Sequence, residues 1–282
     1  MPHIPGTIHE RVWPMAYFDL HTHTYYSFDG HIHPFDLCEA ACKAGLFGIA
    51  MSEHYDFYAD DSFLYYRLFE AGRNPMLERM RSLYGDRLRI WKGIELGQPH
   101  YNLRLYRELM RRADFDLIIG SIHDLPPKEN IYNINYRSQQ DCDRVFESYF
   151  DEMAKMIEAC DFDILAHLDY PVRVMGGVFE DTPELERYES LIRPILRRCV
   201  EKEIALEVNT AGLHKWQKRP GPGLWVLRAY KAYGGEMLTL GSDAHRLQHV
   251  ARGFDWAADM IRQAGFDRIT YFEKRRPKFI DL

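Results

Sequence analysis

Short apolar segments alternate with longer amphipathic segments along most of this chain, and this alternation restricts the possible folds more than any other feature of the sequence. The apolar segments are near-continuous hydrophobic runs, as expected of parallel β-strands that are buried on both faces. The candidate strands are residues 17–21, 47–54, 88–96, 115–123, 162–170, 204–210 and 236–245. The intervening segments have helical spacing and helical end signals. They cover residues 34–45, 61–84, 101–113, 138–160, 182–202, 224–233 and 247–264.

Seven strand-then-helix units in series predict parallel strands joined by right-handed crossovers. Polar residues recur at nearly every strand end, which favours a closed or nearly closed α/β barrel over an open sheet. In such barrels the active site lies at the C-terminal ends of the strands. An open doubly wound sheet is the alternative, but no GxGxxG or Walker sequence follows any strand. The 282 residues are expected to form a single domain, residues 1–282.

Composition and charge argue against several classes of partner. The formal charge is −6, from 36 basic and 42 acidic side chains, so neither a nucleic-acid polymer nor a membrane surface is an expected partner. No apolar run approaches the roughly 18 residues that would span a bilayer. The first residues lack the basic and apolar regions of a signal peptide, and the five cysteines form no CxxC pair. We therefore expect a cytoplasmic protein.

Histidine is the unusual component, and its placement indicates chemistry. Candidate metal ligands occur at or just after six of the seven expected strand ends, whereas the sixth strand ends at Asn209 without one. In an extended segment, residues i and i+2 point the same way, so the two members of an HxH or DxH pair can face one cavity. Imidazoles with a few carboxylates suit Zn²⁺, Mn²⁺ or Fe. The candidates are His21, His23, Asp29, His54, Glu95, His123, His167, Asp243 and His245.

A single histidine near a strand end is usually a hydrogen-bonded structural residue. Six histidines and three acids at successive strand ends are different, because burying so many polar groups without a metal would be costly. Nine ligands also exceed the three or four that one catalytic zinc uses. They are enough for three ions if one acid bridges two of them. His31 and His33 repeat the HxH pattern in a loop flanked by Gly and Pro, and we treat them as loop residues.

The ordered motifs between residues 19 and 245 resemble those of the polymerase and histidinol phosphatase (PHP) superfamily, in its histidinol-phosphatase branch. The motifs read DLHTHT, SEHYD, GIELG, GSIHD, AHLDYP, EVNTAG and LGSDAH. The resemblance implies a distorted (β/α)7 TIM-like barrel with three divalent metal ions at the C-terminal ends of the strands. One ion would take His21, His23, Glu95 and Asp243; a second would share Glu95 with His123 and His167; and the third would use Asp29, His54 and His245.

The resemblance also implies an activity: hydrolysis of the phosphate monoester L-histidinol phosphate to L-histidinol and phosphate, in histidine biosynthesis. Asp243 or His245 would then manage protons near the leaving alkoxide. Family members commonly carry Arg or Lys after the sixth strand. Here His214 or Lys215 occupies that region, and Arg173 is the other candidate for binding phosphate. Solvated loop charges are the alternative reading of these cations.

Substrate recognition beyond the phosphate has weaker signals. Tyr25, Tyr26 and Phe28, in the loop beside the first HxH, could pack on a substrate imidazole, and simple loop packing explains them equally well. Two other functions stay open. One is a PHP phosphoesterase that acts on a nucleotide, another small phosphoester or a phosphodiester. The other is a metal-stabilised barrel that serves only as a binding or structural module, and the full set of ligands argues against it. The sequence does not indicate an oligomeric state.

Overall fold

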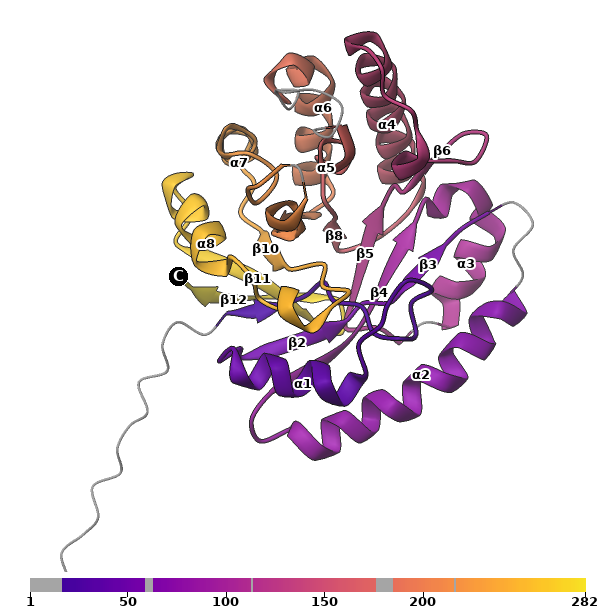
Figure 1. Ribbon diagram of the computed structural model, residues 1–282, viewed down its shortest axis with the longest axis vertical. Helices are drawn as coiled ribbons and strands as arrows, with labels where there is room; N and C mark the ends of the chain where they lie inside the picture. The colour runs from indigo at the N-terminus through magenta and orange to yellow at the C-terminus, as the bar shows by residue number, and fades with distance from the viewer. Residues whose placement is uncertain (1–16, 59–62, 113, 176–184, 216) are drawn as a thin grey trace, which may run out of the picture.

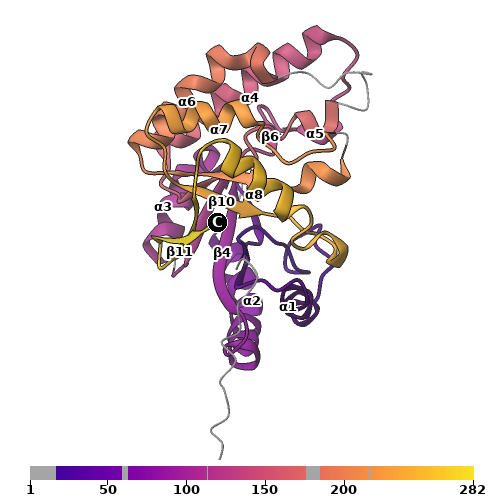
Figure 2. The ribbon, with the colours of Figure 1, turned by 90° about the vertical axis from the view of Figure 1, so that its left-hand side faces the viewer.

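The computed structural model describes residues 17–58, 63–112, 114–175, 185–215 and 217–282. The expected first residues of two helices, 61 and 182, lie outside this part of the chain. Figures 1 and 2 show strands in the centre with helices around them, α1 and α2 together on one side and α4, α6 and α7 on the other. Within the described residues, no helix is long and apolar enough to cross a membrane.

The central strands are parallel and follow one another in chain order around the molecule. They are β1 (Phe18–Asp19), β2 (Gly48–Met51), β4 (Arg89–Gly97), β5 (Leu117–Ser121), β8 (Ile164–Leu165), β9 (Ala205–Asn209) and β10 (Leu238–Gly241). Strand β3 (His54–Asp56) pairs with the end of β4, with His54 opposite Glu95. The last strand returns to the first through the Leu20 N–H, which donates to Leu240 O at 3.0 Å, and a parallel bridge between Thr22 and Ala244. The predicted distorted (β/α)7 TIM-like barrel is confirmed.

Each strand unit is followed by a helix that covers the barrel. The helices are α1 (Pro34–Lys43), α2 (Phe63–Tyr84), α3 (Leu103–Arg112), α4 (Gln139–Ala159), α6 (Glu189–Glu201), α7 (Leu224–Ala232) and α8 (Phe254–Gln263), with a short α5 (Val172–Met175) after β8. Local signals explain where some begin. His33 caps α1 by accepting from the Phe35 N–H at 3.1 Å, and Ser138 and Asp141 form a capping box on α4.

The expected helix over residues 247–264 is wrong at its start. Only Leu247–His249 form a 3-10 turn there, and α8 begins seven residues later, at Phe254. The residue before α8, Gly253, has φ of +78°, in the left-handed region that glycine adopts readily, so the chain changes direction there. Two hairpins were also not predicted: β6 (Asp124–Leu125) with β7 (Glu129–Asn130), and β11 (Arg268–Glu273) with β12 (Arg276–Asp281).

The β11–β12 hairpin covers the end of the barrel at which the strands begin. The ring of Tyr271, in β11, lies 5.7 Å from Phe18, 5.8 Å from Phe47 and 5.2 Å from Trp91, measured between ring centroids. Arg275 pairs with Asp163, just before β8, at 3.1 Å. Because aromatic packing closes this end, the opposite end, where the strands finish, remains available for a functional site.

Candidate metal centre

Glu95 lies at the centre of the predicted ligands and is fully buried near the end of β4. Its two carboxylate oxygens face different histidines. Glu95 Oε2 lies 3.2 Å from His21 Nε2 and 3.5 Å from His23 Nε2, whereas Oε1 lies 3.2 Å from His123 Nε2 and 3.0 Å from His167 Nε2. A carboxylate in this position can bind a different cation with each oxygen. The structure thus brings together the residues expected around the first two ions.

Asp243, just after β10, completes the first group. Its Oδ1 lies 3.5 Å from His23 Nε2 and 3.8 Å from His21 Nε2. Asp243 has φ of +53°, and His167 has φ of +21°. Residues other than glycine seldom adopt these values, and such strain persists where the surrounding structure imposes it, often at functional sites. Two of the predicted ligands are therefore held in unusual backbone conformations.

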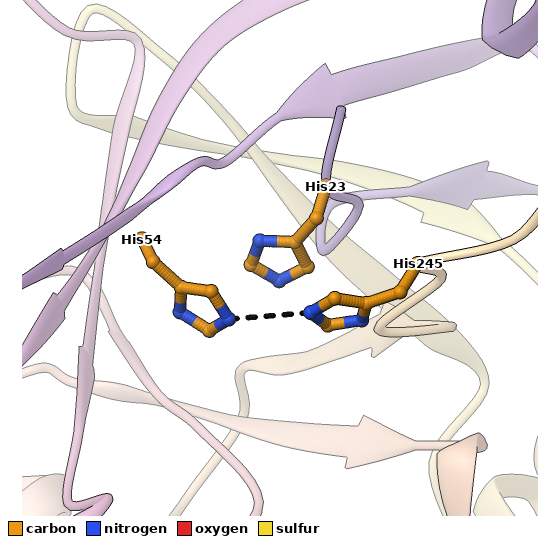
Figure 3. A group of neighbouring side chains, drawn as sticks. All are labelled: His23, His54 and His245. Atoms are coloured by element: carbon orange, nitrogen blue, oxygen red, sulfur yellow. Dashed lines mark hydrogen bonds between the residues drawn. The ribbon is translucent and has the colours of Figure 1, made fainter. Parts of the chain in front are cut away.

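The third predicted group lies nearer the surface. His54 Nε2 is 3.3 Å from His245 Nε2 (Figure 3). Both nitrogens also approach the Asp29 carboxylate, at 3.5 and 3.2 Å. The His23 ring, which belongs to the first group, stacks on two rings of the third group: its centroid lies 4.1 Å from that of His54 and 4.2 Å from that of His245. His54 also places its Nδ1 2.7 Å from Glu95 Oε2, so this histidine joins the third group to the centre.

Four of the candidate ligand histidines form a hydrogen bond through Nδ1, which leaves Nε2 for a metal. His21 Nδ1 lies 2.7 Å from Glu207 Oε1, His123 Nδ1 lies 3.1 Å from Asp56 Oδ1, and His245 Nδ1 lies 3.0 Å from the carbonyl oxygen of Asp243. His23 Nδ1 lies 3.0 Å from Ser27 Oγ, which itself donates to the Glu53 carboxylate. In each case Nδ1 is the donor. The lone pair of Nε2 therefore points inward, as a metal ligand requires.

Several inner atoms of this cluster lie close to one another but have no hydrogen bond. Among the described residues, His21 Nε2, His23 Nε2 and Glu95 Oε2 are buried without a hydrogen bond. Buried polar atoms without partners are costly, and their occurrence together needs an explanation. A divalent cation bound by these nitrogen and oxygen atoms would provide one. The donor set, imidazoles with a few carboxylates, suits zinc, manganese or iron.

The pKa values show that the centre attracts positive charge. Burial opposes protonation of His21, but Glu207, Glu95 and Asp243 outweigh it and raise the pKa of His21 well above its usual value. Burial likewise opposes ionisation of Glu95, but His21, His54 and His123 hold the pKa of Glu95 well below its usual range. The pKa of His23 is lowered by burial and by the neighbouring His54 and His245. The carboxylates are thus held ionised, and they favour a positive charge on or between the imidazoles, which a divalent cation would supply.

A cavity of about 440 Å³ opens above these groups, and all three predicted substrate-binding residues line it. Arg173 is buried, and its Nη1 donates to Asp243 Oδ2 at 2.7 Å. Lys215 Nζ lies 5.1 Å from the centre of the Tyr132 ring. The His214 ring stacks on His249 at 3.6 Å, and burial, with the charge of the neighbouring residues, lowers the pKa of His214 to about 4. Of the two loop histidines, His31 lines the cavity and His33 does not.

Several residues of the centre were missed by the sequence analysis. Glu207 contacts His21, and one of its oxygens also accepts from the His167 N–H at 2.9 Å. Its signal was present: a glutamate inside an apolar strand, two residues before Asn209 and on the same face. Asp56, two residues after His54, could have been recognised by the same spacing. Arg246, which follows a predicted ligand directly, also lines the cavity.

Comparison with known proteins relates this arrangement to one family. The PHP domain family matches residues 19–211. A probable histidinol-phosphatase from Thermotoga maritima is 27% identical over 270 residues, 91% of this chain and 96% of its own. A histidinol-phosphatase from Lactococcus lactis is 26% identical over 262 residues, 92% of this chain and 95% of its own.

Among solved structures, the fold is similar to that of histidinol phosphate phosphatase from Lactococcus lactis, which was crystallised with zinc, L-histidinol and phosphate. The TM-score is 0.75 at 22% sequence identity, and the similarity covers 94% of this chain and 100% of the other. At this level of identity, the similarity establishes a shared fold.

Proposed function

The chain belongs to the PHP domain family, and on this basis we propose that it is a metal-dependent phosphatase that hydrolyses L-histidinol phosphate to L-histidinol and phosphate. The observation that carries the proposal is the position of Glu95, whose two oxygens face separate histidine groups within 3.5 Å. The relatives named as histidinol-phosphatases, which match over nearly their whole length, support the substrate.

Three divalent ions are part of the proposal. His21, His23, Glu95 and Asp243 would hold the first. Glu95, His123 and His167 would hold the second, and Asp29, His54 and His245 the third. Such ions lower the pKa of bound water and stabilise charge on phosphoryl oxygens. The zinc in the Lactococcus lactis structure supports a divalent metal in this fold.

The cavity cations would bind the phosphate. The guanidinium of Arg173 uses Nη1 for Asp243, and its Nε is buried without a hydrogen bond among the described residues. A phosphoryl oxygen would satisfy this donor, and charge-assisted hydrogen bonds of this kind are strong. Lys215 lines the same cavity and would contribute its charge from the side of the loop after β9. His214 lines it too, and because its pKa is lowered to about 4, it would contribute a hydrogen bond and no charge near neutral pH.

Departure of the alcohol requires a proton on the ester oxygen. Asp243 and His245 both line the cavity, and we assign this role to one of them. Asp243 Oδ2 accepts from Arg173, so the guanidinium would connect this carboxylate with the bound phosphate. The remaining cavity walls would exclude water and orient the substrate.

The substrate can be tested by measuring phosphate release from L-histidinol phosphate, a mononucleotide and a phosphodiester side by side. We expect kcat/KM to be far higher for histidinol phosphate. Equal kcat/KM values for histidinol phosphate and the mononucleotide would favour a broad-specificity phosphoesterase of the same family. Activity on the phosphodiester alone would contradict the proposal.

The domain organisation and the cell compartment are also part of the proposal. We propose that the whole chain acts as one domain on a small phosphate ester in the cytoplasm. All five cysteines are unpaired, which is compatible with a reducing compartment. A nucleic-acid polymer or a membrane is not needed for the reaction.

A further inference from the structure

Three aromatic residues in the loop between β1 and α1 differ in what they contact. Tyr25 is 42% exposed, and its ring lies against Tyr26 at 4.6 Å and His33 at 5.3 Å, away from the residues that line the cavity. Tyr26 is half-buried and lies close to Gly72 of α2. Phe28 alone among them lines the cavity. The structure therefore gives the three residues different roles, although they are close in sequence.

Phe28 is 74% exposed. Its ring lies nearly parallel to that of His54, at 5.1 Å and 28°. One face of Phe28 is thus set against a candidate metal ligand, and most of the side chain has no protein cover. Ligand pockets are commonly lined by aromatic side chains, and this ring offers such a surface at the cavity.

Two other rings on the cavity wall, those of Tyr132 and His214, already have partners. Tyr132 has Lys215 over its face and the edge of Tyr170 beside it. His214 is stacked on His249. Among Phe28, Tyr132 and Tyr170, which all line the cavity, Phe28 has by far the most exposed ring for a flat ligand group.

We propose that Phe28 is a specificity-determining residue that stacks on the imidazole ring of the substrate. The inference rests on the proposed function and extends it from the phosphate to the other end of the molecule. When the phosphate is held at the metal centre, the short carbon chain of histidinol phosphate leaves its imidazole close to the centre. His54 belongs to that centre and orients Phe28, so the stacked ring would lie within reach. Stacked aromatic pairs are favourable beyond their burial of apolar area.

The test compares L-histidinol phosphate with L-alaninol phosphate. The second compound keeps the phosphate, the amine and the carbon chain but has no imidazole ring. The ratio of the two kcat/KM values measures recognition of the ring. In Phe28→Ala we expect this ratio to fall roughly 5- to 20-fold, mainly through a higher KM for histidinol phosphate. The inhibition constant of the product L-histidinol should rise in parallel.

Matched variants separate this role from a general effect on the loop. Tyr25→Ala removes an exposed aromatic ring from the same loop and should keep the wild-type ratio. Phe28→Trp retains a flat ring and should restore most of the preference. Metal content, measured for each variant, should stay at the wild-type level.

Two outcomes would overturn different claims. If wild-type protein prefers histidinol phosphate and Phe28→Ala keeps the whole preference, the stacking role is wrong and the proposed function stands. If wild-type protein with its metal releases phosphate from neither compound, the proposed function itself fails.

Discussion

At the scale of single residues, the centre depends most on Glu95. Glu95 is fully buried, and each of its two oxygens faces histidines that come from separate strand ends. The other side chains around it are positioned by neighbours, as His21 is by Glu207 and His123 is by Asp56. A change of one atom at Glu95 or Glu207 should therefore be measurable in metal binding.

Glu95→Gln should lose at least about 100-fold in kcat/KM, because an amide offers one oxygen where the carboxylate offers two and carries no charge. The side chains have nearly the same shape, so circular dichroism should match the wild-type protein. Metal content by elemental analysis should fall. Near wild-type turnover with full metal content would show that Glu95 is not the bridge.

Glu207→Gln tests a residue that positions a ligand without binding metal itself. Loss of the carboxylate beside His21 Nδ1 should weaken metal affinity by about 10- to 100-fold. The measurement is competition with a chromophoric chelator. Glu203→Gln is the control, because Glu203 is exposed just before the same strand. Equal affinities for the two variants would contradict the positioning role.

Arg173 and Lys215 were grouped by sequence as phosphate-binding cations, and the structure separates them. Because Arg173 donates to Asp243, Arg173→Ala should lower both kcat/KM, by roughly 10- to 150-fold, and metal content. Lys215→Ala removes a cation that, within the described part of the chain, lies over the Tyr132 ring and not against a predicted ligand, so it should raise KM and leave metal content unchanged. Unchanged kcat/KM in both variants would mean that phosphate binds elsewhere.

At the scale of elements, the sequence predicted the order of the strands because each parallel strand is a buried apolar run. The predicted ligands follow from the same regularity, since polar residues at the ends of such runs meet at one end of a barrel. Whether each of them binds metal stays a prediction. Glu207 could have been noticed as a glutamate inside an apolar strand, but its role depends on His21, which is 186 residues away in the chain. A local sequence pattern does not reveal a contact between residues so far apart in the chain.

The β11–β12 hairpin was missed for a different reason. Its turn has Lys274 and Arg275 at φ of +50° and +61°, where Asn-Gly would have been the usual signal. The hairpin is stabilised instead by tertiary contacts, chiefly those of Tyr271 with the rings at the start of the barrel strands. Sequence spacing alone does not reveal such contacts.

Tyr271→Ala should therefore act on stability rather than on chemistry. Loss of a buried aromatic ring typically costs about 3 kcal/mol of unfolding free energy. Chemical denaturation should show this loss, whereas kcat/KM and metal content at 25 °C should stay near wild-type values, because the hairpin covers the end of the barrel opposite the centre. A parallel loss of metal content in the folded variant would contradict this separation.

At the scale of the whole molecule, the two ends of the barrel differ in the side chains that they bury. Aromatic packing closes the end where the strands begin, and buried imidazoles and carboxylates occupy the end where they finish. Burying so many polar groups costs free energy, and without a bound cation this cost would destabilise the barrel. The fold and the candidate metal centre are therefore physically linked, and the centre should bind metal before it can act on a phosphate ester.

The most direct test is a metal titration of the metal-stripped protein, followed by phosphate release from L-histidinol phosphate. We expect no release without metal, and release that rises with added zinc or manganese until more than one equivalent is bound per chain. Full release in the presence of a chelator, from protein with at most trace metal, would contradict a metal-dependent phosphatase.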